Sequence, residues 1–485
     1  MSFPFPIGLD TIYYASRMNS GVAFTVGSDL VNSWLVYGIL VALTNITKVD
    51  PFIILKIFAP LLYAGTCAGV YFVAWKRLKW NPKKCLLVSL IFSLQLASLA
   101  VSWQFYRNML GVMVLLFAFP LLKNDASFKE LTVLSVLAIF TVWGHELAMA
   151  SLFFIVFGLL IVSAVKKQKI PYKLFLAILP AILLFMGNFF WISPFATPTD
   201  TNIVRIDDSV WAHPGGLFFL TDYLTVQTPI ETYSSYFQLA SNVTTLFLLL
   251  YGLLMPLIII GYFKDRPFTI WTILLLITGL GCLVAPFFSV FLWARWMLLL
   301  IFPFSFYATN GLHKIVKNQN KNKILNFIKQ IKHAKKICIL LILASMTMAT
   351  LFMVWPLSDN NKGFINWGGT TKYVPSTMQT TSIPLQDIKG TQEAFHWLNN
   401  NMNNNSAVLI HDLFDNWALL YLNTNHQAYL FDFNLENAAN YTKNQGYNNL
   451  YFIWWNPNSN QHDLKIPNQW QPIQNFERIS IYQLT

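Results

Sequence analysis

Charged residues are scarce in this chain: only 11% of its 485 residues are Asp, Glu, Lys or Arg, whereas 55% are hydrophobic. A soluble domain carries about 25% charged residues, so this composition excludes an ordinary soluble protein. Cysteine is also scarce, and none of the four cysteines forms a CxxC pair. We therefore expect neither a disulfide framework nor a zinc site. The opening Met-Ser-Phe-Pro has no basic n-region and no apolar h-region, so it is not expected to be a signal peptide.

Long apolar runs dominate the first 355 residues. A membrane-spanning helix needs about 20 mostly apolar residues. Ten candidate runs lie at 52–75, 85–103, 109–122, 131–146, 147–165, 174–192, 243–263, 268–290, 296–312 and 337–355. A further stretch, 30–47, carries Asn and Thr side chains and is expected to form an interfacial helix. Gly65 and Gly69 form a GxxxG pattern, which predicts close helix packing. The sequence thus predicts a polytopic α-helical membrane bundle of about ten spans.

The basic residues follow every second apolar run. The connections after the first, third, fifth, seventh and ninth runs hold 21 of the 33 lysines and arginines but only 3 of the 21 acidic residues. By the positive-inside rule these connections face the cytoplasm. The net charge of +12 is then mainly an orientation signal, and no nucleic-acid partner is expected. The last connection, 313–336, could also touch anionic lipid head groups. We expect a multi-pass protein of the cell membrane.

This orientation places three long segments outside the cytoplasm. The first, 1–51, is an acidic loop with the interfacial helix, and the second, 193–242, is a large loop within the membrane domain 52–355. The third, 356–485, alternates helical and strand patterns. Expected helices lie at 390–402, 415–423 and 435–445, and expected strands at 406–411, 427–433, 449–455 and 477–484. The alternation predicts an extracytoplasmic α/β domain with a partly parallel sheet.

The first candidate catalytic residue is Asp10, in the stretch FPIGLDTIYY ahead of any apolar run. A carboxylate in an outward loop can act as a general base. The alternative is a structural role, because an Asp followed by TIYYASRM caps a short helix well. Asp207, Asp208 and His213, all in the 193–242 loop, are secondary candidates.

Two arginines are candidate ligands for a phosphate group. Arg107 in SWQFYRNMLG and Arg295 in FLWARWMLLL each lie at an expected outer turn, on the side where cations are scarce. The planar guanidinium fork can grip one specific phosphate. Alternatively, each side chain extends to the phosphates of bulk lipid.

His145 and Glu146, in TVWGHELAM at an expected outer helix end, are candidates for orienting an acceptor or a phosphate. The alternative is an interfacial histidine beside a capping glutamate. The pair lacks the second histidine of a zinc-protease helix, because position 149 is Met149. The sequence contains no Cys/His cluster with metal-ligand spacing and requires no cofactor, although a divalent cation stays open.

An early outward acid, arginines at the outer rim and an outward α/β domain together resemble the GT-C superfamily of membrane glycosyltransferases. This class includes dolichyl-phosphate-mannose-dependent mannosyltransferases and oligosaccharyltransferases. PIGLDTIYYASRMNSG, DLVNSWLVYGILVAL and DPFIILKIFAPLLYAGTCAGVYFVAWKRL carry the resemblance in this order. HDLFDNW stands where the oligosaccharyltransferase domain has WWDYG. The span that usually precedes the acidic loop is not in the sequence, as expected of a shortened gene or one part of a split enzyme.

The resemblance implies transfer of a sugar from a polyprenyl- or dolichyl-phosphate donor in the bilayer to a glycan or protein acceptor on the outer face. It implies that Asp10 acts as general base or holds a divalent cation. From topology alone, Arg107 and Arg295 are expected to stabilise the departing phosphate, and His145 and Glu146 to orient acceptor or phosphate.

Three other functions stay open: a polysaccharide polymerase or ligase, a transport-type protein such as a flippase, and a non-catalytic membrane protein. The large outward α/β domain argues against a polymerase or ligase. Transporters tend to place ionisable groups at the bilayer midplane and often show internal repeats. The apolar runs of this chain hold almost no charge in their middle, and the sequence shows no repeat.

Overall fold

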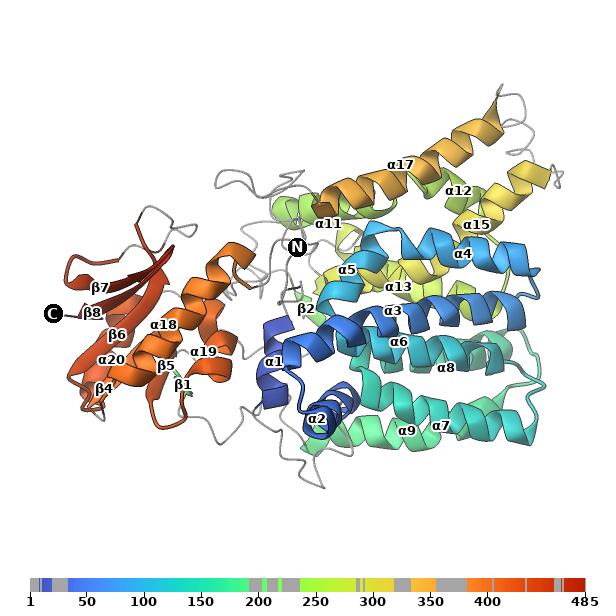
Figure 1. Ribbon diagram of the computed structural model, residues 1–485. Coiled ribbons are helices and arrows are strands. Elements are labelled where there is room, and N and C mark those ends of the chain that lie inside the picture. Colours follow the sequence, from blue (N-terminus) through green and yellow to red (C-terminus); the bar gives the residue numbers. More distant parts are fainter. Residues whose placement is uncertain are drawn as a thin grey trace.

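A computed structural model shows a bundle of helices and a smaller α/β domain, with the short helix α1 (Thr11–Asn19) between them (Figure 1). The structure describes residues 8, 11–19, 34–191, 203–206, 217–219, 236–284, 288–290, 293–317, 333–354, 382–403, 405–431, 434–457, 464 and 466–484. The four cysteines are free, as the sequence predicts.

The described bundle helices follow the apolar runs of the sequence. They are α3 (Pro51–Lys76), α4 (Pro82–Ser93), α5 (Leu96–Gln104), α6 (Tyr106–Ala118), α7 (Phe128–Gly144), α8 (Glu146–Val165), α9 (Tyr172–Trp191), α11 (Tyr236–Tyr251), α12 (Met255–Gly261), α13 (Arg266–Val284), α14 (Trp293–Leu299), α15 (Ile301–Lys317) and α17 (Ala334–Val354). The helix α2 (Leu35–Thr47) is seen end-on in Figure 1 and crosses the direction of its neighbours. The interfacial position of this helix stays a prediction.

Local capping signals decide where several of these helices begin. The Asp50 carboxylate accepts a hydrogen bond from the Phe52 N–H at 2.8 Å, and Pro51 opens α3. Asn81 caps α4 in the same way, ahead of Pro82. At α7, Ser127 and Glu130 form a capping box. These caps supply partners for backbone N–H groups that have none within the helix.

The predicted count of ten spans is not confirmed. Among the described residues, three helices are long and apolar enough to cross a membrane, namely α3, α8 and α13. Counting the bent pairs α4/α5 and α11/α12 as one span each raises this number to five. The bends are 70° and 74°, so the expected spans 85–103 and 243–263 are each broken into two helices. The expected span 268–290 is too long, because α13 ends at Val284 and 288–290 forms a strand.

The break between α4 and α5 is held by buried side chains. Gln95 at the break accepts a hydrogen bond from the Ser345 hydroxyl of α17 at 2.8 Å. Ser98 donates to the Gln95 carbonyl at 2.8 Å, and Tyr63 of α3 donates to the Ser93 carbonyl at 2.7 Å. Backbone carbonyls freed inside an apolar bundle need such partners, so the bend is a built feature of the fold.

The GxxxG pattern packs as expected. A Cβ added at Gly65 would lie 2.6 Å from the Met113 sulfur, and one added at Gly69 would lie 3.0 Å from the Leu116 Cβ. Both neighbours belong to α6, so the absence of side chains on one face of α3 lets the two helices approach closely. The predicted close helix packing is confirmed.

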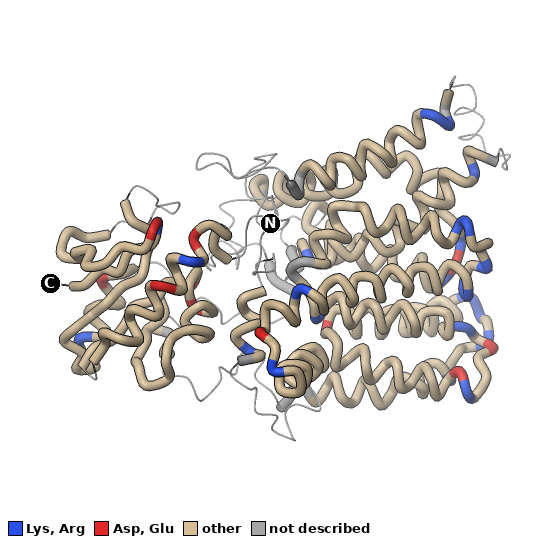
Figure 2. Tube along the Cα trace, in the orientation of Figure 1, with Lys and Arg blue, Asp and Glu red and all other residues tan. Residues whose placement is uncertain are grey.

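Charge is distributed unevenly along the bundle. Figure 2 shows Lys and Arg gathered at the end farthest from the α/β domain, in the α3–α4, α6–α7 and α8–α9 connections. A smaller group of charged residues lies at the opposite end, near α1. The two ends of the bundle therefore differ in electrostatic character.

The α/β domain is built on a six-stranded sheet of order β1-β5-β4-β6-β8-β7. Its strands are β1 (Ile203–Arg205), β4 (Ser406–His411), β5 (Gln427–Phe431), β6 (Asn449–Trp455), β7 (Trp470–Phe476) and β8 (Ile479–Leu484), and its helices are α18 (Ile388–Asn401), α19 (Asp415–Tyr421) and α20 (Leu435–Asn444). The first four strands in the order are parallel, and β8 and β7 complete the sheet antiparallel. A second, two-stranded sheet pairs β2 (Leu217–Phe219) with β3 (Phe288–Val290).

The sequence predicts the interior of this domain better than its edges. The described helices and strands between 388 and 455 lie where the patterns indicate, and β8 matches the expected strand at 477–484. The exposed edge strand β7 is missed, because Pro472 interrupts its pattern. The other edge, β1, comes from the 193–242 segment, so the sheet extends beyond the predicted domain 356–485.

The carboxyl end of β4 leads to the contact with the bundle. His411 ends β4, and α19, which follows shortly after it, packs against α1. The Ser16 hydroxyl of α1 donates to the Asn416 side chain at 3.4 Å, and the Phe52 ring of α3 stacks on Trp417 at a centroid distance of 6.4 Å. The N-terminal segment thus lies between the sheet domain and the bundle.

Candidate functional site

The candidate site lies at the α1 end of the bundle, where α7 gives way to α8. A Cβ on Gly144 would be 2.7 Å from the Gly111 Cα, so only glycine allows α6 and α7 to come this close. The chain then turns extended at His145, whose Nδ1 accepts the Leu147 N–H at 3.0 Å and caps α8. The tight Gly111–Gly144 contact and the cap together fix the imidazole at the helix junction.

His145 is held in its neutral form. Its side chain is 7% exposed, and this burial lowers the pKa of the imidazole to about 3, because the neighbouring Glu146 offsets only part of the desolvation. Since Nδ1 accepts a hydrogen bond, the proton of the neutral ring resides on Nε2. That nitrogen lies 3.4 Å from the Glu146 Oε2, so the imidazole presents its N–H toward a carboxylate.

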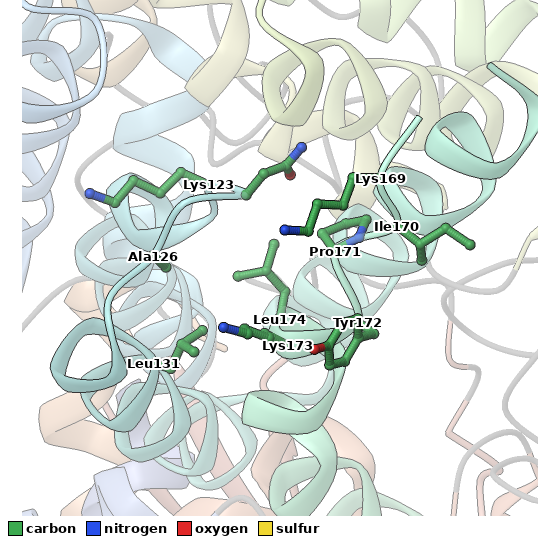
Figure 3. A pocket seen from close by; sticks show the side chains of 10 residues that line it. Lys123, Ala126, Leu131, Lys169, Ile170, Pro171, Tyr172, Lys173 and Leu174 are labelled. Atoms are coloured by element: carbon green, nitrogen blue, oxygen red, sulfur yellow. The ribbon is translucent and has the colours of Figure 1, made fainter. Parts of the chain in front are cut away.

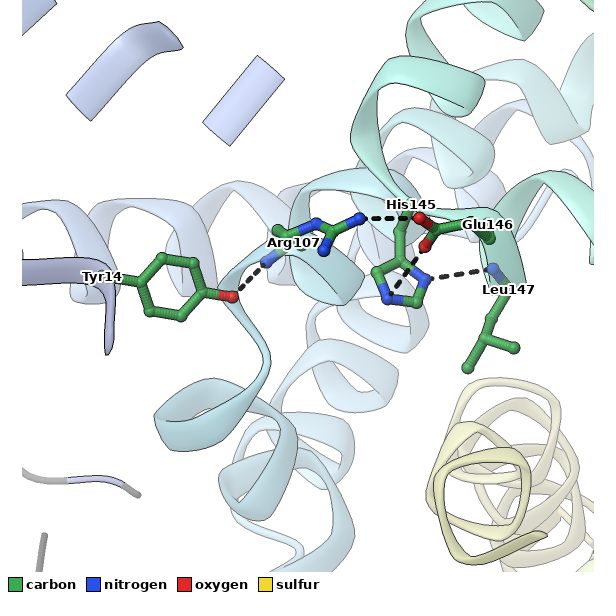
Figure 4. A network of polar contacts seen from close by, with 5 residues as sticks. All are labelled: Tyr14, Arg107, His145, Glu146 and Leu147. Carbon is green, nitrogen blue, oxygen red and sulfur yellow. Dashed lines mark hydrogen bonds and ion pairs between the residues drawn. The ribbon is translucent and has the colours of Figure 1, made fainter. Parts of the chain in front are cut away.

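Arg107, in the first turn of α6, pairs with Glu146 at the start of α8. Its Nη2 lies 2.7 Å from the Glu146 Oε1 (Figure 4). The side chains are 24% and 37% exposed, respectively, so the ion pair is open to solvent on one side. The Arg107 Nε–H is buried and has no hydrogen-bond partner within the described part of the chain. An unsatisfied buried donor costs about 1–3 kcal/mol, and a ligand oxygen could satisfy it.

Three tyrosines surround Arg107. The Arg107 backbone N–H donates to the Tyr14 hydroxyl of α1 at 3.3 Å, as Figure 4 shows. The guanidinium lies 5.6 Å from the centroid of the Tyr37 ring of α2, and Tyr14 packs on Tyr106 at 4.8 Å. Aromatic faces stabilise a cation in this position. Helices α1, α2 and α6 are thereby joined around one guanidinium.

Arg295 of α14 belongs to the same region. Its guanidinium lies 4.6 Å from the centroid of the Phe105 ring, which directly precedes α6. Its charge also acts on the His145 imidazole and contributes to the low pKa of that ring. No carboxylate of the described residues forms an ion pair with Arg295. With His145 neutral, the charges of the three side chains Arg107, Arg295 and Glu146 sum to one positive charge.

Four of the predicted site residues lie outside the described part of the chain: Asp10, Asp207, Asp208 and His213. The other four, Arg107, His145, Glu146 and Arg295, come together although they span almost 190 positions of the sequence. Sequence reasoning missed Tyr14, Tyr37 and Tyr106. The pair of tyrosines directly after DTI was their visible signal, because polar aromatics ahead of an apolar run are typical of a membrane interface.

The described residues do not suit a divalent cation. No group of three or more His, Cys, Asp or Glu side chains lies together within the described ranges. At the candidate site the described carboxylate is Glu146, and Arg107 already engages it. Hard cations prefer several oxygen ligands, and the described residues of the site offer only this one carboxylate.

No family model matches the chain, and no curated protein matches it in sequence. Among solved structures, the chain is similar to the crystal structure of ArnT from Cupriavidus metallidurans in the apo state, with a TM-score of 0.50. The superposition covers 99% of this chain and 94% of that one at 11% sequence identity. At this identity the likeness shows a shared fold, that of a helical membrane bundle with a C-terminal sheet domain.

The neutral, buried His145 makes the stability of the protein depend on pH. The unfolded chain binds a proton at this side chain below a pH of about 6.5, whereas the folded chain does so only near pH 3. Stability should therefore fall as the pH decreases through this window. Between pH 7 and pH 5 this histidine should cost about 2 kcal/mol, or roughly 2 °C in Tm for a chain of 485 residues.

His145→Asn keeps a side-chain acceptor for the Leu147 N–H but does not titrate. Between pH 7 and pH 5, the Tm of this variant should fall by roughly 2 °C less than the Tm of the wild type. Thermal unfolding of both proteins in detergent checks this, and parallel Tm profiles across the window would contradict a neutral, buried His145.

Proposed function

We propose that the protein is a membrane glycosyltransferase that moves a sugar from a polyprenyl- or dolichyl-phosphate donor to an acceptor at the α1 end of the bundle. The observation that carries the proposal is the environment of the Arg107 guanidinium. Its Nε is buried, the Tyr37 ring lies beside it, and its ion pair with Glu146 is partly exposed to solvent. The fold likeness supports it, because ArnT is a transferase of the GT-C family. The fold alone does not define a reaction, so the site must supply the argument.

The donor phosphate is the natural partner of the two arginines. A phosphate diester carries one negative charge, which balances the single net positive charge of Arg107, Arg295 and Glu146. Arginine binds phosphate through two parallel N–H···O bonds, and the unpartnered Nε–H of Arg107 is one such donor. In a site of low dielectric these contacts stabilise the negative charge that develops on the leaving phosphate.

The transfer breaks the bond between the sugar C1 and the phosphate oxygen and forms a bond between C1 and the acceptor heteroatom. The electron pair of the broken bond stays on the phosphate, and the acceptor proton passes to the Asp10 carboxylate. Asp10 directly precedes Thr11, whose hydroxyl lies 3.4 Å from that of Tyr106, the neighbour of Arg107. This sequence proximity supports placing the base near the phosphate site.

The basic end of the bundle supports an orientation for this reaction. Lysines and arginines cluster at the end opposite to α1, and such ends face the cytoplasm. The candidate site and the sheet domain would then lie outside the cytoplasm, where the acceptor is met.

Removal of the Asp10 charge should abolish most of the transfer. Asp10→Asn keeps the size of the side chain but not its basicity, so transfer from a lipid-phosphate donor should fall about 10²-fold or more. Radiolabelled sugar transfer in reconstituted vesicles measures this. Asp125→Asn, which removes the same charge from an exposed loop at the other end of the bundle, is the matched control. Equal activity of the two variants would remove Asp10 from the mechanism.

Loss of either arginine should weaken donor binding. Each charge-assisted contact contributes about 1.5–3 kcal/mol, so Arg107→Ala and Arg295→Ala should each lower donor affinity roughly 10- to 150-fold. Arg107→Lys should fall between wild type and Ala, because lysine keeps the charge and loses the fork. Arg266→Ala, at an exposed position of the basic end, is the control. Unchanged donor affinity in both alanine variants would favour a non-catalytic protein.

Glu146 should behave as a competitor of the donor phosphate for Arg107. Glu146→Gln retains an oxygen that can accept from the guanidinium but removes the opposing charge, so the local net charge rises by one. Donor affinity should then increase several-fold. Glu146→Ala removes both the negative charge and the accepting oxygen. Comparison with Glu146→Gln therefore separates the effect of the charge on donor affinity from the effect of orienting the Arg107 side chain. Weaker donor binding by Glu146→Gln would mean that Glu146 positions Arg107 instead of competing for it.

A further inference from the structure

A cavity of about 50 Å³ lies at the basic end of the bundle, between the α6–α7 and α8–α9 connections (Figure 3). Its lining includes Lys123, Lys169, Ile170, Tyr172, Lys173 and Leu174. From Leu131 to Gly144 the helix α7 rises about 20 Å at 1.5 Å per residue. The cavity and the arginine site therefore lie near opposite surfaces of the bundle.

Two of the three lysines at this cavity are available to a ligand. Lys123 is engaged, because its ammonium lies 2.7 Å from the Glu130 carboxylate. This hydrogen bond lowers the pKa of Glu130 to about 2, so the pair stays ionised. Figure 3 shows the ammonium groups of Lys169 and Lys173 directed toward the space between the two connections. Within the described residues, neither of them forms an ion pair with a carboxylate.

The size of the cavity suits a small anionic group. A water molecule needs about 10–15 Å³ of cavity volume on this measure, so a cavity of about 50 Å³ admits a few water molecules or one phosphate group. Leu174, at its floor, is buried. Two apolar or aromatic side chains of the lining point outward, since Ile170 is 47% exposed and Tyr172 is 55% exposed. Tyrosine and aliphatic side chains in this position are typical of a protein surface that meets lipid.

We propose that this cavity seats the head-group phosphate of an anionic phospholipid, while Ile170 and Tyr172 contact the adjoining glycerol and acyl region. The two ammonium groups supply two positive charges, which attract the single negative charge of a head-group phosphate. A free inorganic phosphate would use the ammonium groups alone and leave the exposed apolar rim without a role. The lipid is therefore the occupant that uses both features of the cavity, and the proposal holds whether or not the protein transfers a sugar.

The test compares lipid retention by two double variants of the full chain. Lys169→Gln/Lys173→Gln removes the two cavity charges. Lys79→Gln/Lys83→Gln removes two exposed charges from the α3–α4 connection at the same end of the bundle. Each protein is reconstituted with phosphatidylglycerol and phosphatidylcholine, and native mass spectrometry counts the lipids that remain bound. Thermal unfolding confirms that both variants are folded.

The cavity variant should lose phosphatidylglycerol retention about 5-fold for each lysine, because a basic residue near an anionic surface contributes roughly this factor. The control variant should change less than 2-fold, and phosphatidylcholine should be unaffected in both. Equal losses in the two variants would overturn the proposal, because they would indicate non-specific electrostatic attraction between anionic lipid and the basic end of the bundle. Unchanged retention in the cavity variant, or displacement of the lipid by millimolar inorganic phosphate, would overturn it as well.

Discussion

The ion pair between Arg107 and Glu146 is the contact on which the arrangement of this end of the bundle depends. A guanidinium at the rim of an apolar bundle is costly unless charge and hydrogen bonds compensate it. Glu146 provides the opposite charge at 2.7 Å, the Tyr37 ring lies 5.6 Å from the guanidinium, and the Tyr14 hydroxyl accepts the Arg107 backbone N–H. Because one edge of the pair is open to solvent and the Nε–H is unsatisfied, the compensation is incomplete. An anionic ligand could complete it.

The backbone around His145 makes this ion pair possible. Gly111 and Gly144 let α6 and α7 touch, so the first turn of α6 lies beside the start of α8. A histidine at the junction caps α8 through Nδ1 and stays neutral. If it were charged, three cations would surround one described carboxylate. The neutral ring therefore keeps the local charge low enough for both arginines to lie near each other.

The same region connects the two parts of the molecule. Helix α1 contacts Arg107 through Tyr14 and reaches the sheet domain through Ser16 and Asn416. The sheet domain therefore contacts α1, the helix that follows Asp10 in the sequence. An acceptor held by that domain would approach the bundle from the side on which the arginines lie.

The sequence predicts those features that depend on composition and short periodicity. Apolar runs form helices, the Gly65 and Gly69 pattern forms a helix contact, and the four strands β4, β5, β6 and β8 lie within a few residues of the expected positions. Features set by distant contacts were not visible. The bend at Gln95 depends on Ser345, 250 positions away, and β1 joins a sheet whose other strands begin two hundred residues later.

At the candidate site, too, the sequence predicts local features but not contacts between distant residues. Sequence topology placed Arg107, His145, Glu146 and Arg295 on one side, because each lies at a helix end with the same expected orientation. It could not show that Arg107 pairs with Glu146, since the two are 39 positions apart and no spacing rule links them. The tyrosine pair after DTI indicates a membrane interface, but the contact between Tyr37 and the guanidinium depends on the direction of α2, which only the folded structure shows. Asp10 stays a sequence prediction.

The most direct test of the account is the structure of the protein bound to a polyprenyl phosphate. The account predicts phosphate oxygens about 2.7–2.9 Å from the Arg107 guanidinium nitrogens, the distance of a charge-assisted hydrogen bond. It also predicts that the Glu146 carboxylate is displaced from its present 2.7 Å contact with Nη2. A phosphate bound elsewhere, with the Arg107–Glu146 ion pair intact, would contradict the central claim.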